Sequence, residues 1–161
     1  MEFMNMSGSN AVLSERDVLR ELQIKDFGQL TKNHVLAFAF MYDSIKPKAA
    51  KKALKQFPNF DIAVKQTLGE LMEALDKALE TNGKVVEEFY DSCSSMIKTL
   101  RRQIVNSTGS LEEREDTIRK LIEISKTIDR KNRSSGEYNG ITVGELVAES
   151  VFDGLFGLFF N

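Results

Sequence analysis

Apolar side chains recur at steps of three and four residues over more than forty positions in the middle of the chain. The series is Val64, Leu68, Leu71, Leu75, Ala78, Val85, Phe89, Cys93, Met96, Leu100 and Ile104. This spacing follows the turn of an α-helix and puts the apolar side chains on one helix face. Such a face has to be buried against other helices, so the pattern predicts an all-α fold built on this segment.

The series is interrupted at Asn82-Gly83, where the helix either continues or ends. Asn and Gly together cost roughly 1.5 kcal/mol relative to Ala in a helix interior, and Gly is the usual residue just past a helix end. Counting in sevens from Leu68 to Phe89, however, keeps one register across the gap. We therefore favour one helix over residues 60–105, about 70 Å long and bent at Gly83, over two stacked helices.

Three shorter helices are predicted before this segment. Ser14 with Asp17 forms a variant capping box, Thr31 is a suitable cap for a second helix, and Pro47 suits the first turn of a third. The expected ranges are 15–23, 35–42 and 47–57. The second range is apolar on every side, and we prefer a central helix to a buried strand because no partner strand pattern occurs elsewhere.

A further helix is predicted after a short turn at residues 107–109, because Ser110 and Glu113 form a full capping box. The short turn favours antiparallel packing on the 89–104 half of the long helix. The predicted fold is thus an all-α helical bundle built on a long antiparallel helical hairpin, with three short N-terminal helices and an apolar C-terminal helix. The expected divisions are a disordered N-terminus at 1–13, a bundle domain at 14–133, a linker at 134–140 and the C-terminal helix at 141–161.

Residue counts exclude several classes of protein. One Cys and one His among 161 residues are too few for a disulfide scaffold or a Cys/His zinc site. Their positions favour a capping or surface role for His34 and a buried thiol for Cys93. Acidic motifs at residues 87–91 and 112–116 have the spacing of a magnesium site, but a second inward-facing acidic pair is missing. We therefore expect no catalytic site, no cofactor and no metal.

Four lysines share one face of the expected 47–57 helix, opposite its alanines and Leu54. They are Lys48, Lys51, Lys52 and Lys55, and we call them the lysine face. The face could contact nucleic-acid backbone or anionic lipid, although no Arg or aromatic residue is interleaved to read bases. The plainer interpretation is that it lies along residues 61–91, which carry eight acidic residues and three lysines.

Residues 19–31 read Leu-x-x-Leu-x-Ile-x-x-Phe-x-x-Leu-Thr. This spacing loosely resembles the two-helix elements of helix-hairpin-helix and sterile-alpha-motif domains. The glycine-rich hairpin that contacts DNA in the first of these is missing, so the resemblance implies helix packing and carries over no binding residue.

Residues 141–161 form a distinct apolar segment, with twelve apolar residues among its first twenty. As a helix, they would place Val147, Val151, Phe152, Leu155, Phe156, Leu158 and Phe159 opposite an acidic stripe of Glu145, Glu149 and Asp153. The length suits a membrane span, with Arg130, Lys131 and Arg133 as headgroup contacts, but each acid would cost roughly 2.5–3.5 kcal/mol at the bilayer centre. The apolar side could pack against the chain's own bundle, against another protein or a second copy, or in a membrane, and the sequence leaves these three alternatives open.

We therefore expect a non-enzymatic helical protein–protein interaction module of the regulator or inhibitor type, binding a protein partner or a second copy of itself. The expected contacts are Phe152, Leu155, Phe156 and Phe159, with the lysine face as a second contact. The alternatives are a membrane-associated helical protein with an inserted C-terminal segment and, less favoured, nonspecific nucleic-acid binding through residues 46–55. The polar start of the chain and the lone cysteine favour the cytoplasm, or a peripheral membrane location in the first alternative.

Overall fold

The computed structural model describes residues 12–134, which form an all-α fold, as expected. The helices are α1 (Glu15–Leu22), α2 (Val35–Met41), α3 (Pro47–Gln56), α4 (Phe60–Val105) and α5 (Leu111–Ser134), joined by the 3₁₀ turns η2 (Phe27–Gln29), η3 (Lys32–His34) and η4 (Tyr42–Ser44). Within this range there is no β-strand, only an isolated bridge between Leu13 and Ile45. The expected C-terminal helix lies outside the described residues, as do residues 135–140 of the linker.

The caps expected at Ser14 and Ser110 set the starts of α1 and α5, whereas Thr31 caps the η3 turn and not α2. Ser14 and Asp17 exchange the two hydrogen bonds of a capping box at the start of α1. At the start of α5, the N–H of Glu113 donates to the Ser110 hydroxyl and the N–H of Ser110 donates to the Glu113 carboxylate, both at 3.2 Å. Leu13, which we expected in a disordered N-terminus, is buried, and its backbone bonds to the 44–46 segment.

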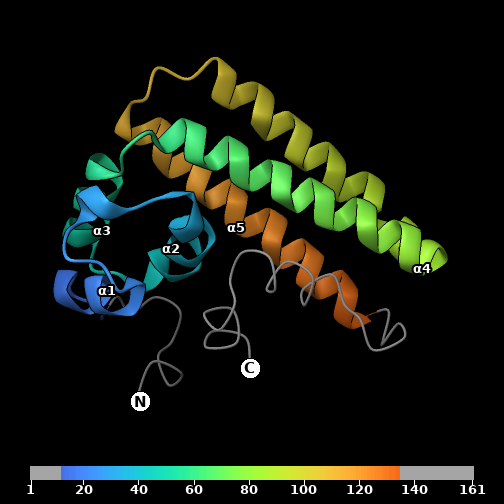
Figure 1. Ribbon diagram of the computed structural model, residues 1–161, viewed down its shortest axis with the longest axis horizontal. Coiled ribbons are helices and arrows are strands. Elements are labelled where there is room, and N and C mark those ends of the chain that lie inside the picture. The colour runs from blue at the N-terminus through green and yellow to red at the C-terminus, as the bar shows by residue number, and fades with distance from the viewer. Residues whose placement is uncertain (1–11, 135–161) are drawn as a thin grey trace.

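Helix α4 reverses direction between Asp76 and Tyr90. The Tyr90 hydroxyl donates a hydrogen bond to the Asp76 carboxylate, whereas fourteen residues of straight helix would separate these positions by about 21 Å. Figure 1 shows the two arms side by side, the outgoing arm in green and the returning arm in yellow. We call residues 60–76 the outgoing arm and residues 90–105 the returning arm.

The expected bounds of this helix agree with the structure, but the expected length of about 70 Å is wrong. The apolar stripe itself is confirmed on both arms, with Leu68, Leu75, Leu100 and Ile104 all buried. Two separate arms each need such a stripe, and a shared heptad register does not reveal the direction of the second arm. The interruption at Asn82-Gly83, which we interpreted as a bend, lies within the reversal.

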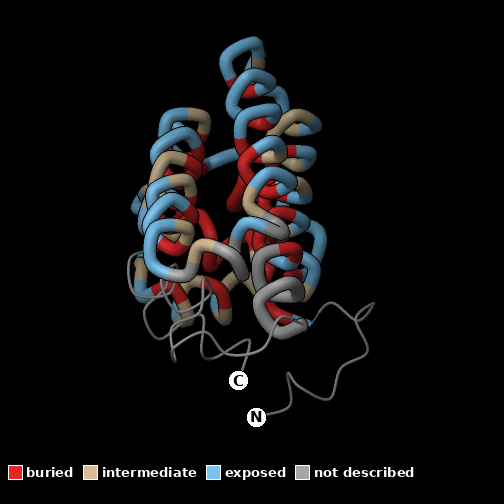
Figure 2. The backbone as a smooth tube through the Cα atoms, turned by 90° about the vertical axis from the view of Figure 1, so that its right-hand side faces the viewer, coloured by how far each residue is buried: buried red, intermediate tan, exposed pale blue. Residues whose placement is uncertain are grey.

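The two arms and α5 form three adjacent columns, with α1, α2 and α3 gathered at one end (Figure 1). Figure 2 shows the buried residues turned toward the space between the columns. Helix α2 is buried over almost its whole surface, which confirms the prediction of a central helix. Edge-to-face aromatic contacts link Phe38 to Phe57 and Phe57 to Phe60, joining α2 to the start of α4.

Arg114 connects α3, α4 and α5. One guanidinium nitrogen donates to the carbonyl oxygens of Leu54 at 2.8 Å and Phe57 at 3.2 Å, at the end of α3. The guanidinium carbon lies 5.2 Å from the centre of the Phe60 ring. The Arg114 side chain therefore satisfies carbonyl groups that the end of α3 leaves without helical partners, and it holds the start of α5 beside the start of α4.

Gly69 and Gly109 both have room for a side chain but differ in backbone conformation, so replacing each with Ala shows the effect of that conformation on stability. A Cβ atom added at Gly69, within α4, or at Gly109, before α5, would meet nothing within 4 Å, but Gly109 has a φ of +81°. We expect Gly69→Ala to stabilise the fold by about 0.5–1 kcal/mol and Gly109→Ala to destabilise it by about 1–2 kcal/mol. Urea unfolding of both variants measures the difference, and the same sign for both would contradict these conformations.

The Arg114 junction predicts a second difference in stability. Arg114→Ala removes two charged hydrogen bonds and a cation–π contact, and we expect a loss of about 2–4 kcal/mol. Arg119→Ala on the same helix is the control. Arg119 is exposed, and its guanidinium nitrogen lies 3.7 Å from a carboxylate oxygen of Asp43, so we expect this variant to lose at most about 1 kcal/mol of unfolding free energy. Equal losses in the unfolding free energy would mean that the junction does not hold the three helices together.

Candidate interaction surface

The lysine face lies on α3, and all four of its side chains are exposed. The opposite side of this helix is buried through Ala50, Ala53 and Leu54, packed on α5 and the η2 turn. Pro47 occupies the first turn of α3, as expected. The structure therefore brings the four lysines together on one solvent-facing side of a helix whose other side belongs to the core.

The plainer interpretation, in which the lysine face lies along acidic residues 61–91, is wrong. Within the described chain, the one ion pair of the face joins Lys52 to Glu15 of α1, at 3.0 Å. Two acids of α4 have partners away from α3: Glu70 pairs with Lys32, and Asp76 accepts from Tyr90. Because α4 folds back on itself and α3 packs on α5, the acidic stretch does not cover the lysines.

The expected contacts Phe152, Leu155, Phe156 and Phe159 lie outside the described residues. Arg130, Lys131 and Arg133 belong to the last turns of α5, and their side chains are not described. In the part of the chain that is described, no helix has both the length and the apolar character needed to cross a bilayer. The same part exposes three large hydrophobic residues, Val12, Ile62 and Val105.

His34 and Cys93 have the positions that the sequence favours. The backbone N–H of Thr31 donates to Nδ1 of His34 at 2.9 Å, so the imidazole completes the cap of the η3 turn. Burial lowers the pKa of His34 below its usual value of 6.5. The thiol-bearing Cys93 is fully buried in the returning arm. The two side chains belong to different parts of the fold and form no nucleophile–base pair.

The acidic motif at residues 112–116 is occupied by structural contacts. Glu113 accepts hydrogen bonds from Thr108 and Ser110 in the preceding turn, and Asp116 pairs with Lys120 at 2.7 Å. Among the side chains that the structure describes, no cluster of three or more His, Cys, Asp or Glu has the arrangement of a metal site.

A groove that the sequence did not predict lies between the returning arm and α5. It has a volume of about 220 Å³ and is lined by Met96, Thr99 and Leu100 on one side and by Lys120, Glu123 and Ile124 on the other. Amphipathic periodicity marks Met96 and Leu100 as core positions but does not show which helix packs beside them, so no sequence signal could have located the groove.

No protein-family model matches the chain, and no curated protein or solved structure matches it either.

The Glu113 cap predicts a pH dependence of stability. Hydrogen bonds from Thr108 and Ser110 lower the pKa of Glu113 from its usual 4.5 to about 2. A lowered carboxyl pKa stabilises the fold above the unfolded value, so this contribution is complete above pH 4.5 and is lost as the pH falls toward 2. We expect Glu113→Gln to lower the unfolding free energy at neutral pH and to differ progressively less from the natural chain in acid.

Glu112→Gln is the matched control, because Glu112 lies beside Glu113 in the first turn of α5 and is exposed. Urea midpoints across the acid range give the comparison. A difference between Glu113→Gln and the natural chain that stayed constant down to the lowest pH would show that the cap is not the origin of the effect.

Proposed function

We propose that this chain is a non-enzymatic helical module that binds an acidic protein partner. Its contacts are the lysine face of α3 and the apolar side of residues 141–161, through Phe152, Leu155, Phe156 and Phe159. The lysine face carries the argument, since it concentrates positive charge on the surface and, among its four lysines, one ion pair within the described residues joins Lys52 to Glu15. The finer architecture proposed with it is a C-terminal helix that follows a short linker after α5.

The energetics of α3 support this assignment. Its packing energy comes from the buried side, whereas Lys48, Lys51 and Lys55 form no ion pair within the described chain. Like charges on one helix face repel each other by a few tenths of a kcal/mol per pair. Repulsion among the four lysines therefore destabilises the free protein slightly. An acidic partner would remove this repulsion, attract the lysine face and speed association.

The apolar part of the contact is assigned to residues 141–161 because the described body offers little exposed apolar surface. Val12, Ile62 and Val105 are the large hydrophobic residues exposed among the described side chains, and a few such residues are ordinary on a protein surface. An interface needs a desolvated apolar centre with a polar rim. In this proposal the phenylalanines of 141–161 supply the apolar centre, and the lysine face supplies part of the polar rim.

An acidic protein suits the lysine face better than nucleic acid does. The face has four lysines and no arginine or aromatic residue, whereas base recognition and stacking depend on those residue types. Nonspecific contact with a phosphate backbone stays the second candidate, because it needs only positive charge. Insertion of 141–161 into a membrane is the third.

A charge reversal with a matched control tests the lysine face. The test variant is K48E/K51E/K52E/K55E, and the control is K25E/K65E/K77E/K98E, four exposed lysines from α4 and the α1–η2 connection with no ion pair in the described chain. Both variants have the same net charge. With polyglutamate as the acidic probe, we expect the test variant to bind at least about fourfold more weakly than the control variant, because four exposed charge pairs contribute about 0.2–1 kcal/mol each.

Binding is measured by surface plasmon resonance at two salt concentrations, with single-stranded DNA and phosphatidylserine vesicles as parallel probes. Equal loss in the two variants would contradict the proposal, because net charge alone would then explain binding. Tighter, lysine-face-dependent binding to DNA would replace the acidic protein with nucleic acid, and vesicle binding that requires residues 141–161 would favour the membrane.

A further inference from the structure

The groove between the returning arm and α5 is suited to receive apolar side chains. Leu100 and Ile124 are almost fully buried at its base, and Met96 is half-buried beside them. Its volume of about 220 Å³ is below the roughly 300–1,000 Å³ of small-molecule sites. The space therefore suits one or two side chains of a docked helix, and the flexible thioether of Met96 adapts well to an aromatic ring.

The chain that follows α5 has the right length to reach this groove. Helix α5 ends at Ser134, and residues 135–140 are long enough to reverse direction and contain two glycines. If a helix starting at Ile141 runs back along α5, equal rise per residue brings position 151 level with Ile124 and position 155 level with Lys120. Three apolar residues of the segment, Val151, Phe152 and Leu155, then come level with the groove.

Charge complementarity supports the same register. Position 149 comes level with Lys126 and position 145 with residue 130, so Glu149 and Glu145 lie near the basic end of α5 while facing water on the outer side of the segment. Lys126 is exposed, and the neighbouring rim of the groove carries Lys120. Glu123 also lines the groove and is the one acid there. With the apolar side turned inward, the acidic stripe stays in water, where its charges cost least.

We propose that the apolar side of residues 141–161 docks in the groove between the returning arm and α5 of the same chain. Resting on the proposed function, this docking regulates it: Phe152 and Leu155 are covered until a partner displaces the segment. A six-residue linker gives an effective concentration of the order of millimolar, so docking within one chain precedes docking between chains. The affinity for a partner is then reduced by the docked fraction.

Cross-linking within the full chain tests the docking site. In a Cys93→Ala background, Thr99→Cys in the groove is combined with Ser150→Cys, and a short bismaleimide joins thiols that lie close together. The control pair is Lys65→Cys with Ser150→Cys, because Lys65 is exposed on the outgoing arm, away from the groove lining. We expect about fivefold more monomeric cross-linked product from the groove pair, because docking raises the local thiol concentration.

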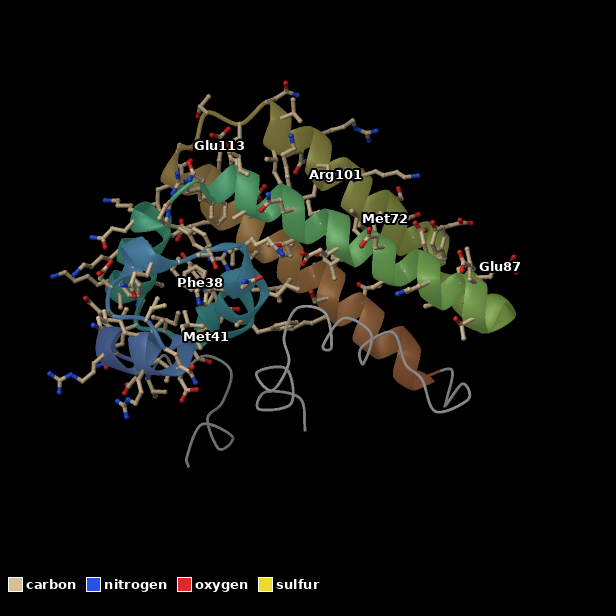
Figure 3. All side chains as sticks on the ribbon, viewed as in Figure 1. Phe38, Met41, Met72, Glu87, Arg101 and Glu113 are labelled. Carbon is tan, nitrogen blue, oxygen red and sulfur yellow. The ribbon has the colours of Figure 1, made fainter. Side chains whose placement is uncertain are left out.

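Two methionines of α4 provide a second matched pair of variants, Met96 in the groove and Met72 on the outgoing arm. Figure 3 labels Met72, together with Arg101 on the returning arm. Met96→Gln makes the groove polar, and Met72→Gln changes an equally half-buried methionine elsewhere on α4. We expect the first to lower the yield of the groove cross-link by about threefold and the second to leave it nearly unchanged. Circular dichroism confirms that both variants are folded.

Three outcomes are distinguishable. A monomeric cross-link that depends on Met96 supports docking within the chain. Equal yields from the groove pair and the control pair overturn it. Cross-links found only between two chains also overturn it and assign the groove to the segment of a second copy. None of these readouts involves the lysine face or polyglutamate, so failure here leaves the proposed function standing, and failure of the lysine test leaves the docking result unaffected.

Discussion

The contact of Arg114 with the end of α3 and with the Phe60 ring is the constraint on which the remaining arrangement depends. It joins residues from three helices, with its hydrogen-bond partners 57 and 60 positions away in the sequence. Because α5 begins at this junction, its course along α4 is set from its first turn. The aromatic cluster of Phe38, Phe57 and Phe60 packs at the same end and excludes water from it, which strengthens the charged hydrogen bonds.

The reversal of α4 decides which surfaces are covered. A straight helix of the same length would have left one half for α5 and the other for the short helices. With the arms folded together, α5 contacts the short helices as well as α4, and the lysine face of α3 turns away from the acidic stretch. The reversal also places the returning arm beside α5 and thereby creates the groove lined by Met96 and Ile124.

The two proposed contacts, the lysine face and the apolar side of residues 141–161, would contribute to binding in different ways, one through charge and the other through buried apolar area. In the proposed function, the lysine face would attract and orient an acidic partner over a distance of about a Debye length, whereas the phenylalanines of 141–161 would provide the area that is removed from water. Docking of that segment in the groove would keep the second contact from acting alone. The partner would then be selected by charge first, and the apolar contact would follow release.

Local signals in the sequence determined the helix boundaries, the capping boxes at Ser14 and Ser110, and the buried stripe of α4, because caps and periodicity act within a few residues. They also determined that four lysines share one face of α3. Only the tertiary structure decided the direction of the returning arm, the Arg114 junction and the groove. These depend on contacts between residues far apart in the chain, and a helical stripe of fixed period is satisfied equally well by a straight helix and by one that folds back.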